Sequence, residues 1–132
     1  MGKEKSEEIE KIKEAVNYYI DGAKKQDYEL IYKGWHSEAK MMALNDDTTL
    51  KIYDRSIWEE WYKNAKEDPN VTRTSEILSI DFHGIAGNAK VKTIIENPDG
   101  TIIYIDYLNL LKIEDKWQIA NKIFNTERIP KN

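Results

Sequence analysis

Hydrophobic and polar residues follow two different periods along this chain. The first third carries apolar residues at helical spacing, and the second half carries strand-like runs separated by turn residues. The apolar positions of the first segment are Ile9, Ile12, Val16, Tyr19, Ile20 and Ala23. This spacing predicts an N-terminal helix, and Ser6 is a suitable N-cap for it.

Two further helices and two short strands are expected before residue 70. Asp27 can cap a short helix over residues 28–34. Residues 35–44 and 49–54 predict two strands joined by the turn sequence "NDDT".

The third helix starts near residue 56. Its cap is either Asp54 or the capping-box pair Ser56 and Glu59. Its apolar stripe consists of Ile57, Trp58, Trp61, Tyr62 and Ala65. Because the helix has one such stripe, we expect Trp61 to pack inward.

The rest of the chain predicts an antiparallel meander. Four strand-like runs cover residues 72–83, 89–96, 101–113 and 116–124. Helices followed by such a meander indicate an α+β fold in one domain over residues 1–132, with three N-terminal helices packed on a strongly curved, mainly antiparallel sheet. We expect residues 1–8 to fray, residues 128–132 to form a tail, and a cone-shaped interior to leave a ligand pocket.

Asp106 lies in the middle of an apolar strand, where an unpaired carboxylate is costly. A turn at Glu114 and Asp115 pairs Ile113 with Lys116, and a regular register then puts Asp106 opposite Ile123 and diagonal to Asn121. This face also carries Trp117 and several leucines and isoleucines, so we expect it to point into the cone.

The opposite face of this hairpin is also rich in apolar groups. It carries Ile105, Tyr107, Asn109 and Leu111 beside Gln118, Ala120, Lys122 and Phe124. A sheet with two apolar faces needs cover on both, so we expect a homodimer joined through this face.

Composition narrows the classes of function. The formal charge is −4 with no basic stripe, which argues against nucleic-acid binding. The absence of cysteine excludes disulfides and thiolate chemistry. No apolar run approaches the roughly 20 residues of a membrane span, and the charged start does not resemble a signal peptide, so we expect a cytoplasmic protein without membrane contact.

Metal and cofactor chemistry have little support. The chain has two histidines, no cysteine and no ligand set with recognisable spacing, so we expect no metal. It also lacks a phosphate loop, a nucleophile elbow and a dinucleotide-binding motif, so we expect no cofactor.

Three segments resemble a known family: "YIDG" at residues 19–22, Trp35–His36 with Ala39, and "DYLNLLKIEDKWQIANKIF" at residues 106–124. In the last segment the matching positions are Asp106, Tyr107, Leu110, Trp117, Ile119, Asn121 and Lys122. On these residues the chain resembles the nuclear transport factor 2-like superfamily of cone-shaped α+β domains. Within it the chain is similar to the branch described as "putative lumazine-binding", close to the polyketide-cyclase-like proteins.

The resemblance covers nearly all of the chain, with two departures. Ser37 stands where the branch usually has proline, and Glu114–Asp115 stand where it usually has glycine. The superfamily implies a homodimer joined through the sheets and a pocket open at the wide end of the cone. It does not imply one activity, because its members include isomerases, dehydratases, cyclases and pure binding or scaffold domains.

The candidate site residues each have two interpretations. Asp106 either exchanges a proton with a ligand or is a structural carboxylate bonded to tyrosine or backbone. His36 either shares that chemistry or stabilises a helix C-terminus. The candidate ligand-binding residues are Tyr19, Trp35, His36, Trp61, Asp106 and Asn121, although aromatic residues at helical spacing usually fill the core.

Two functions follow from the sequence. The first is a binding domain whose apolar pocket, with a few polar groups, holds a small apolar or aromatic molecule. The second is a cofactor-free isomerase, cyclase or dehydratase that uses Asp106 with His36. If Asp106 serves the pocket, replacing it with asparagine should leave folding at least as favourable, because buried charge is costly, and should weaken binding or turnover.

Overall fold

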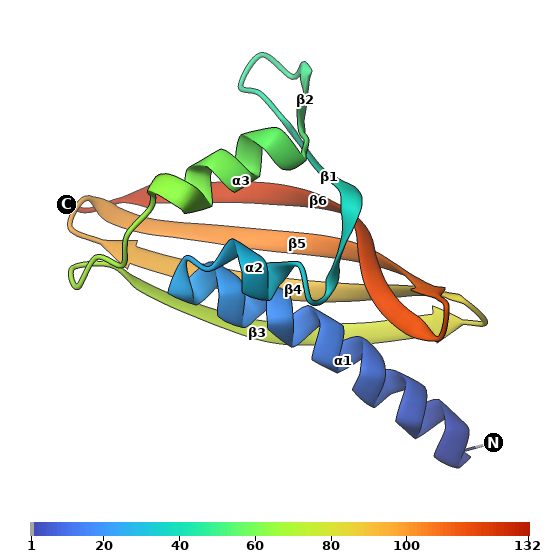
Figure 1. Ribbon diagram of the computed structural model, residues 1–132. Helices are drawn as coiled ribbons and strands as arrows, with labels where there is room; N and C mark the ends of the chain where they lie inside the picture. Colours follow the sequence, from blue (N-terminus) through green and yellow to red (C-terminus); the bar gives the residue numbers. More distant parts are fainter. Residues whose placement is uncertain (1) are drawn as a thin grey trace.

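A computed structural model describes residues 2–132 of the protein. Three helices lie on one side of a six-stranded curved sheet (Figure 1). The elements in chain order are α1 (Gly2–Lys25), α2 (Tyr28–Ile31), β1 (Trp35–Leu44), β2 (Leu50–Tyr53), α3 (Arg55–Asn64), β3 (Thr72–His83), β4 (Ala86–Asn97), β5 (Gly100–Ile113) and β6 (Lys116–Pro130). The predicted α+β class and the helices-then-meander order are confirmed.

The sheet is mainly antiparallel. Its strand order is β2-β1-β6-β5-β4-β3, and β1 against β6 is the parallel pair. Strands β3 to β6 form a meander with tight turns, which makes each neighbour antiparallel. Strand β1 follows the first two helices and runs beside the last strand, β6, in the sheet.

Helix α1 starts earlier than the expected cap. It runs from Gly2, so Ser6 lies inside it and is not its N-cap. Residues 2–8, which we expected to fray, are helical, and Glu8 is bonded to the sheet. Its carboxylate accepts from Lys112 Nζ at 2.7 Å and from Trp117 Nε1 at 2.5 Å. At the other end, residues 128–130 pair with β5 instead of forming a tail.

The core lies between the helices and the covered face of the sheet. Buried residues of α1, among them Ile12, Val16 and Tyr19, belong to one cluster with Leu108, Leu110 and Ile119 of the last hairpin. Gly34 allows the close approach of β1 to α1, because a Cβ there would overlap the backbone of Ala15. The Gly34 carbonyl accepts from Ile119 N at 2.8 Å, which fixes the start of β1 against β6.

Helix α3 is capped by Asp54, whose side chain accepts from Ile57 N. Its buried residue is Trp58, and Trp61 is 49% exposed. The expectation that Trp61 packs inward is therefore wrong. Trp58 reaches the core and the half-buried Tyr62 of the next turn packs against it, whereas Trp61 beside Tyr62 stands half exposed.

The turn between β5 and β6 has the expected position. Ile113 pairs with Lys116, and Glu114 and Asp115 have φ angles of 50° and 66°. A two-residue hairpin turn of type I′ requires this left-handed backbone at both positions, a conformation that glycine adopts more easily than glutamate or aspartate.

The register of the last hairpin changes at Ala120. Leu110 pairs with Ile119 as expected, but Asn109 pairs with Asn121, so Ala120 has no partner in β5. Such a bulge inserts one residue and moves every later side chain of β6 to the other face. Lys122 therefore points into the interior and Asn121 points away from it, the reverse of both expectations.

Candidate functional site

A cavity of about 260 Å³ lies between the helices and the end of the sheet nearest α3. Its lining comes from seven elements, so only the tertiary structure assembles it. The lining residues are Tyr19, Met41, Tyr53, Trp61, Tyr62, Arg73, Tyr104, Asp106, Lys122, Phe124, Thr126 and Arg128.

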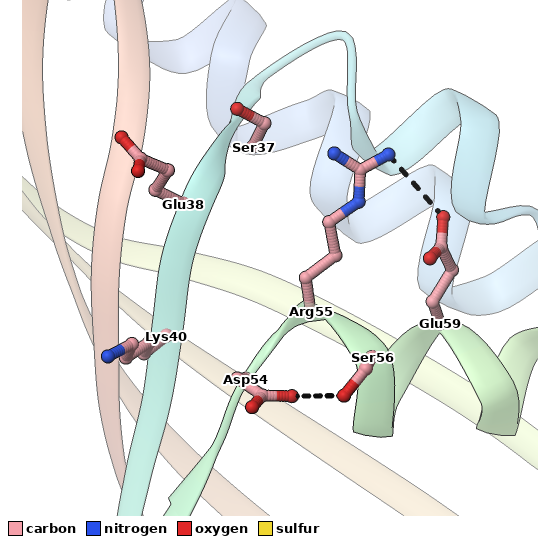
Figure 2. Close-up of a pocket in the computed structure, with 7 residues that line it drawn as sticks. All are labelled: Ser37, Glu38, Lys40, Asp54, Arg55, Ser56 and Glu59. Atoms are coloured by element: carbon pink, nitrogen blue, oxygen red, sulfur yellow. Dashed lines mark hydrogen bonds and ion pairs between the residues drawn. The ribbon is translucent and has the colours of Figure 1, made fainter.

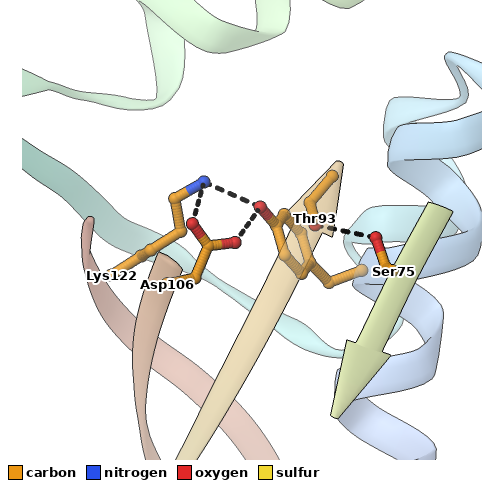
Figure 3. Close-up of polar contacts among 5 residues, drawn as sticks. Ser75, Thr93, Asp106 and Lys122 are labelled. Atoms are coloured by element: carbon orange, nitrogen blue, oxygen red, sulfur yellow. Dashed lines mark hydrogen bonds and ion pairs between the residues drawn. The ribbon is translucent and has the colours of Figure 1, made fainter. Parts of the chain in front are cut away.

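Three buried polar side chains form a hydrogen-bonded chain on the floor of this cavity (Figure 3). Lys122 Nζ donates to Tyr19 Oη at 2.7 Å, and Tyr19 Oη donates to Asp106 Oδ2 at 3.0 Å. Lys122 Nζ lies 3.8 Å from the other carboxylate oxygen, Asp106 Oδ1. The helix α1, strand β5 and strand β6 each supply one member, and the bulge at Ala120 brings Lys122 into the group.

The environment shifts the pKa values of two of these groups. Burial and the negative charge of Asp106 raise the pKa of Tyr19 well above its usual value, so the phenol keeps its proton. Burial lowers the pKa of Lys122, an effect that Asp106 opposes and Arg73 increases. Lys122 can therefore lose its proton more readily than a solvated lysine.

Two buried polar atoms at the cavity have no hydrogen-bond partner. They are Asp106 Oδ1, in a residue that is 1% exposed, and Arg73 Nε on β3. The neighbouring pair Ser75 and Thr93, in contrast, is satisfied by a bond of 2.7 Å between its hydroxyls (Figure 3). Buried polar groups usually have partners, so these two atoms indicate places where a ligand can bond.

Aromatic rings make the walls of the cavity. The Tyr53 ring lies 4.9 Å from that of Trp61 and 6.3 Å from that of Phe124, between centroids. Tyr104 packs edge-on against Phe124 at 5.8 Å, and Lys122 Nζ lies 4.6 Å from the centre of the Phe124 ring. Such walls suit a flat ligand.

Three of the six residues that the sequence suggested line this cavity. Tyr19 and Asp106 are on its floor, and the half-exposed Trp61 is on its wall. Trp35 lies behind the floor, with its ring 5.3 Å from the Tyr19 ring, and does not line the cavity. Asn121 is on the opposite face of the sheet, where its Oδ1 accepts from Asn109 Nδ2 at 2.8 Å.

His36 does not meet Asp106. Successive side chains of a strand point to opposite sides, so His36 points away from the side of Trp35. It lines a separate, open groove between α2, α3 and the β5–β6 turn, and its Nδ1 accepts from the backbone of Glu38 at 3.0 Å. The pairing of Asp106 with His36 therefore has no geometric basis.

Sequence reasoning missed Lys122, Arg73 and Arg128. Arg73 carries a signal, because Arg73, Ser75 and Ile77 alternate along β3 and must share the covered face of the sheet. No sequence pattern placed Lys122 on the covered face, since nothing in "QIANKIF" predicts a β-bulge.

A second hollow, between β1 and the start of α3, is open and lined by polar side chains that are mostly exposed (Figure 2). Asp54 caps the helix and accepts from the Ser56 hydroxyl at 2.6 Å, and Arg55 pairs with Glu59 at 3.6 Å. Within residues 2–132 no group of three or more His, Asp or Glu side chains could hold a metal ion, and no helix is long and apolar enough to cross a membrane.

Solved structures with the same fold include two of unknown function. A nuclear transport factor 2-like protein from Shewanella baltica OS155 is 27% identical, with 92% of this chain and 95% of that chain covered and a TM-score of 0.79. A similar protein from Methylobacillus flagellatus KT is 25% identical, with 92% and 93% covered and a TM-score of 0.73. The association domain of CaMKII from C. elegans is 13% identical, with 95% and 99% covered and a TM-score of 0.69, a likeness of fold alone.

No curated protein sequence matches the chain significantly. The family described as "Putative lumazine-binding" matches residues 7–125, which is most of the chain. Both the matched range and the similar structures agree with the cone-shaped α+β fold. The chain therefore belongs to this family, within the nuclear transport factor 2-like superfamily.

Proposed function

We propose that this chain is a binding domain for a small organic molecule, held in the cavity above Tyr19, Asp106 and Lys122. The observation that carries the proposal is Asp106 Oδ1, a buried carboxylate oxygen without a hydrogen-bond partner at the cavity. Leaving such an acceptor unsatisfied costs about 1–3 kcal/mol or more. A ligand that donates a hydrogen bond there would recover this free energy, which favours binding.

The family and the similar structures support a ligand-binding domain of this fold. The character of the cavity differs from the apolar pocket that the sequence suggested. Arg73, Lys122 and Arg128 contribute cationic groups beside the aromatic walls. The proposed ligand therefore has polar groups as well as a ring.

Native mass spectrometry of the intact, gently purified chain tests this proposal. We expect an added mass that is lost when the protein is unfolded, or else acquired from a panel of small aromatic fragments. Thr126→Trp puts a large ring into the cavity and should abolish the added mass. Thr74→Trp, on an exposed position of β3 outside the cavity lining, is the matched control and should keep it. No bound molecule in either case, or equal binding by both variants, would refute the proposal.

A second candidate is a cofactor-free enzyme of the isomerase, cyclase or dehydratase type. The chain of hydrogen bonds from Lys122 through Tyr19 to Asp106 favours it, because such a chain can move a proton at a bound ligand. Asp106 would be the acid–base group, with Tyr19 and Lys122 as its partners in place of His36. Incubation of the protein with its ligand in D₂O distinguishes the two functions, since an enzyme that moves a proton at carbon would place deuterium on a carbon atom of the ligand and a binding domain would not.

We also propose a homodimer through the face of the sheet that points away from the helices. On this face, the register of the sheet aligns four residues in one row across four strands: Ile52, Met42, Ile123 and Tyr107. Ile52 and Ile123 are each 48% exposed and Tyr107 is 40% exposed, so this row offers apolar area that no helix covers. Beside it, Asn88, Asn109 and Asn121 form a hydrogen-bonded ladder.

Analytical ultracentrifugation at micromolar concentration should give about twice the chain mass of 15.5 kDa. Ile123→Glu puts a charge in the proposed interface and should give monomers. Ile57→Glu, at an exposed apolar position of α3, is the control and should leave the dimer intact. A wild-type chain that stays monomeric at high concentration would exclude the dimer.

A further inference from the structure

The cavity collects positive charge inside an acidic protein. Its lining holds three cationic side chains, Arg73, Lys122 and Arg128, and one carboxylate, Asp106, which gives 3 − 1 = +2 when Lys122 is protonated. The chain as a whole carries a formal charge of −4. The net charge of the cavity is thus opposite to that of the molecule.

The protein itself leaves this positive charge largely unbalanced. Within residues 2–132 neither arginine forms an ion pair, and Arg73 Nε is buried without a hydrogen-bond partner. The charge of Arg73 is close enough to lower the pKa of both Tyr19 and Lys122. Arg73 is half-buried, and its Nε is a buried donor without a partner or a counter-charge, so an anion in this cavity would be bound favourably.

The rest of the cavity lining restricts the kind of molecule that can carry the anionic group. Aromatic walls favour a flat ring, and the volume of about 260 Å³ is below the roughly 300–1,000 Å³ usual for drug-sized ligands. The free Asp106 Oδ1 accepts a hydrogen bond, so the ligand needs a donor as well. A second negative charge on the anionic group would be repelled by Asp106, which favours a carboxylate over a phosphate dianion.

We propose that the ligand of this cavity is a small aromatic carboxylic acid with a hydrogen-bond donor on its ring. Its carboxylate is bound by Arg73 and Lys122, its ring packs among Tyr53, Trp61 and Phe124, and its donor bonds Asp106 Oδ1. This inference rests on the proposed binding function, whose ligand class it specifies.

Titration of the isotope-labelled full chain, followed by NMR, tests the charge requirement. The probes are 4-hydroxybenzoate, its neutral isostere 4-hydroxybenzamide, and phenyl phosphate. We expect the acid to bind at least about tenfold more tightly than the amide, since one charge-assisted contact is worth about that factor. Arg73→Gln should weaken binding of the acid about tenfold and leave the amide unchanged. Arg55→Gln, which alters an arginine of the hollow in Figure 2, is the control and should change neither.

The outcomes separate this inference from the proposed function. Equal affinity for the acid and the amide would refute the proposal that the ligand is an anion, and would leave the proposed binding function intact. Tighter binding of phenyl phosphate than of 4-hydroxybenzoate would refute the proposal that the anionic group is a carboxylate. If none of the three probes perturbs the signals of the cavity residues at roughly 10 mM, the proposed ligand class fails, while the binding function itself is tested by the native mass spectrometry above. Arg128→Gln, at an exposed position of the cavity lining, is the second variant if Arg73→Gln does not fold. Because it lowers the positive charge of the cavity, it should also weaken binding of the acid and leave binding of the amide unchanged.

Discussion

Replacing Asp106 with asparagine keeps the shape of the side chain and removes one buried negative charge. The amide oxygen can still accept from Tyr19, so the loss falls on the attraction to Lys122. At the 3.8 Å between Lys122 Nζ and Asp106 Oδ1, two unit charges attract by about 4 kcal/mol at an effective dielectric constant of about 20. This is an upper value, because Lys122 keeps its bond to Tyr19 and can release its proton. We expect Asp106→Asn to lower the free energy of unfolding by about 2–4 kcal/mol at pH 7.

The loss should depend on pH in a defined direction. Burial lowers the pKa of Lys122, and Asp106 opposes this shift, so the variant has a still lower Lys122 pKa. Between that lowered pKa and the usual pKa of lysine, the unfolded chain binds more protons than the folded one. Stability therefore rises with pH across this window. Once Lys122 is neutral in both proteins the lost attraction no longer matters, so the difference in stability should shrink as the pH rises toward the usual pKa of lysine.

Urea denaturation followed by tryptophan fluorescence measures this difference. Lys122→Met is the partner in a double-mutant cycle, because it removes the cation and keeps the apolar stem. In that background Asp106→Asn should cost much less than in the wild type. Either of two results would refute an attraction between Asp106 and Lys122: an Asp106→Asn variant as stable as the wild type at pH 7, or an equal loss of unfolding free energy in the wild-type and Lys122→Met backgrounds. The sequence alone suggested that the variant would fold at least as well, since it gave no sign of the buried lysine.

Three further predictions concern stability. Trp61→Ala should cost only about 1–2 kcal/mol in a denaturant melt, while Trp58→Ala should cost about 3–5 kcal/mol, because Trp61 is half exposed and Trp58 is buried; equal losses would contradict this placement. Asp115→Gly should raise the unfolding free energy by about 0.5–1 kcal/mol, since its φ of 66° suits glycine, and a lower melting temperature would contradict the turn geometry. Glu8→Gln should cost about 1 kcal/mol at pH 7. Hydrogen bonds from Lys112 and then Trp117 lower the pKa of Glu8, so this contribution should be lost as the pH falls through that lowered pKa, and a cost that persists in acid would contradict it.

The sequence by itself determined most of the elements of this protein. Helical and alternating periods are local properties, so they predicted three helices, the meander and the turn at Glu114 and Asp115. Asp27 and Asp54 cap their helices as the sequence suggested, because a cap bonds only to its own first turn. The alternation along β5 also placed Asp106 and Leu108 on the covered face, since β5 itself contains no extra residue.

The tertiary structure alone decided which side chains meet at the site. One unpaired residue, Ala120, exchanges Asn121 for Lys122 beside Asp106, and a bulge depends on how two strands fit and not on either sequence alone. The position of α3 at the edge of the fold leaves Trp61 half exposed, although its helical period matches that of the buried Trp58. His36 and Asp106 have the residue types of an acid–base pair. Strand alternation and the packing of Trp35 against Tyr19 nevertheless put them in different hollows. Local pattern predicts the elements and their periods, and only the packing of distant elements decides which side chains, and which charges, come together.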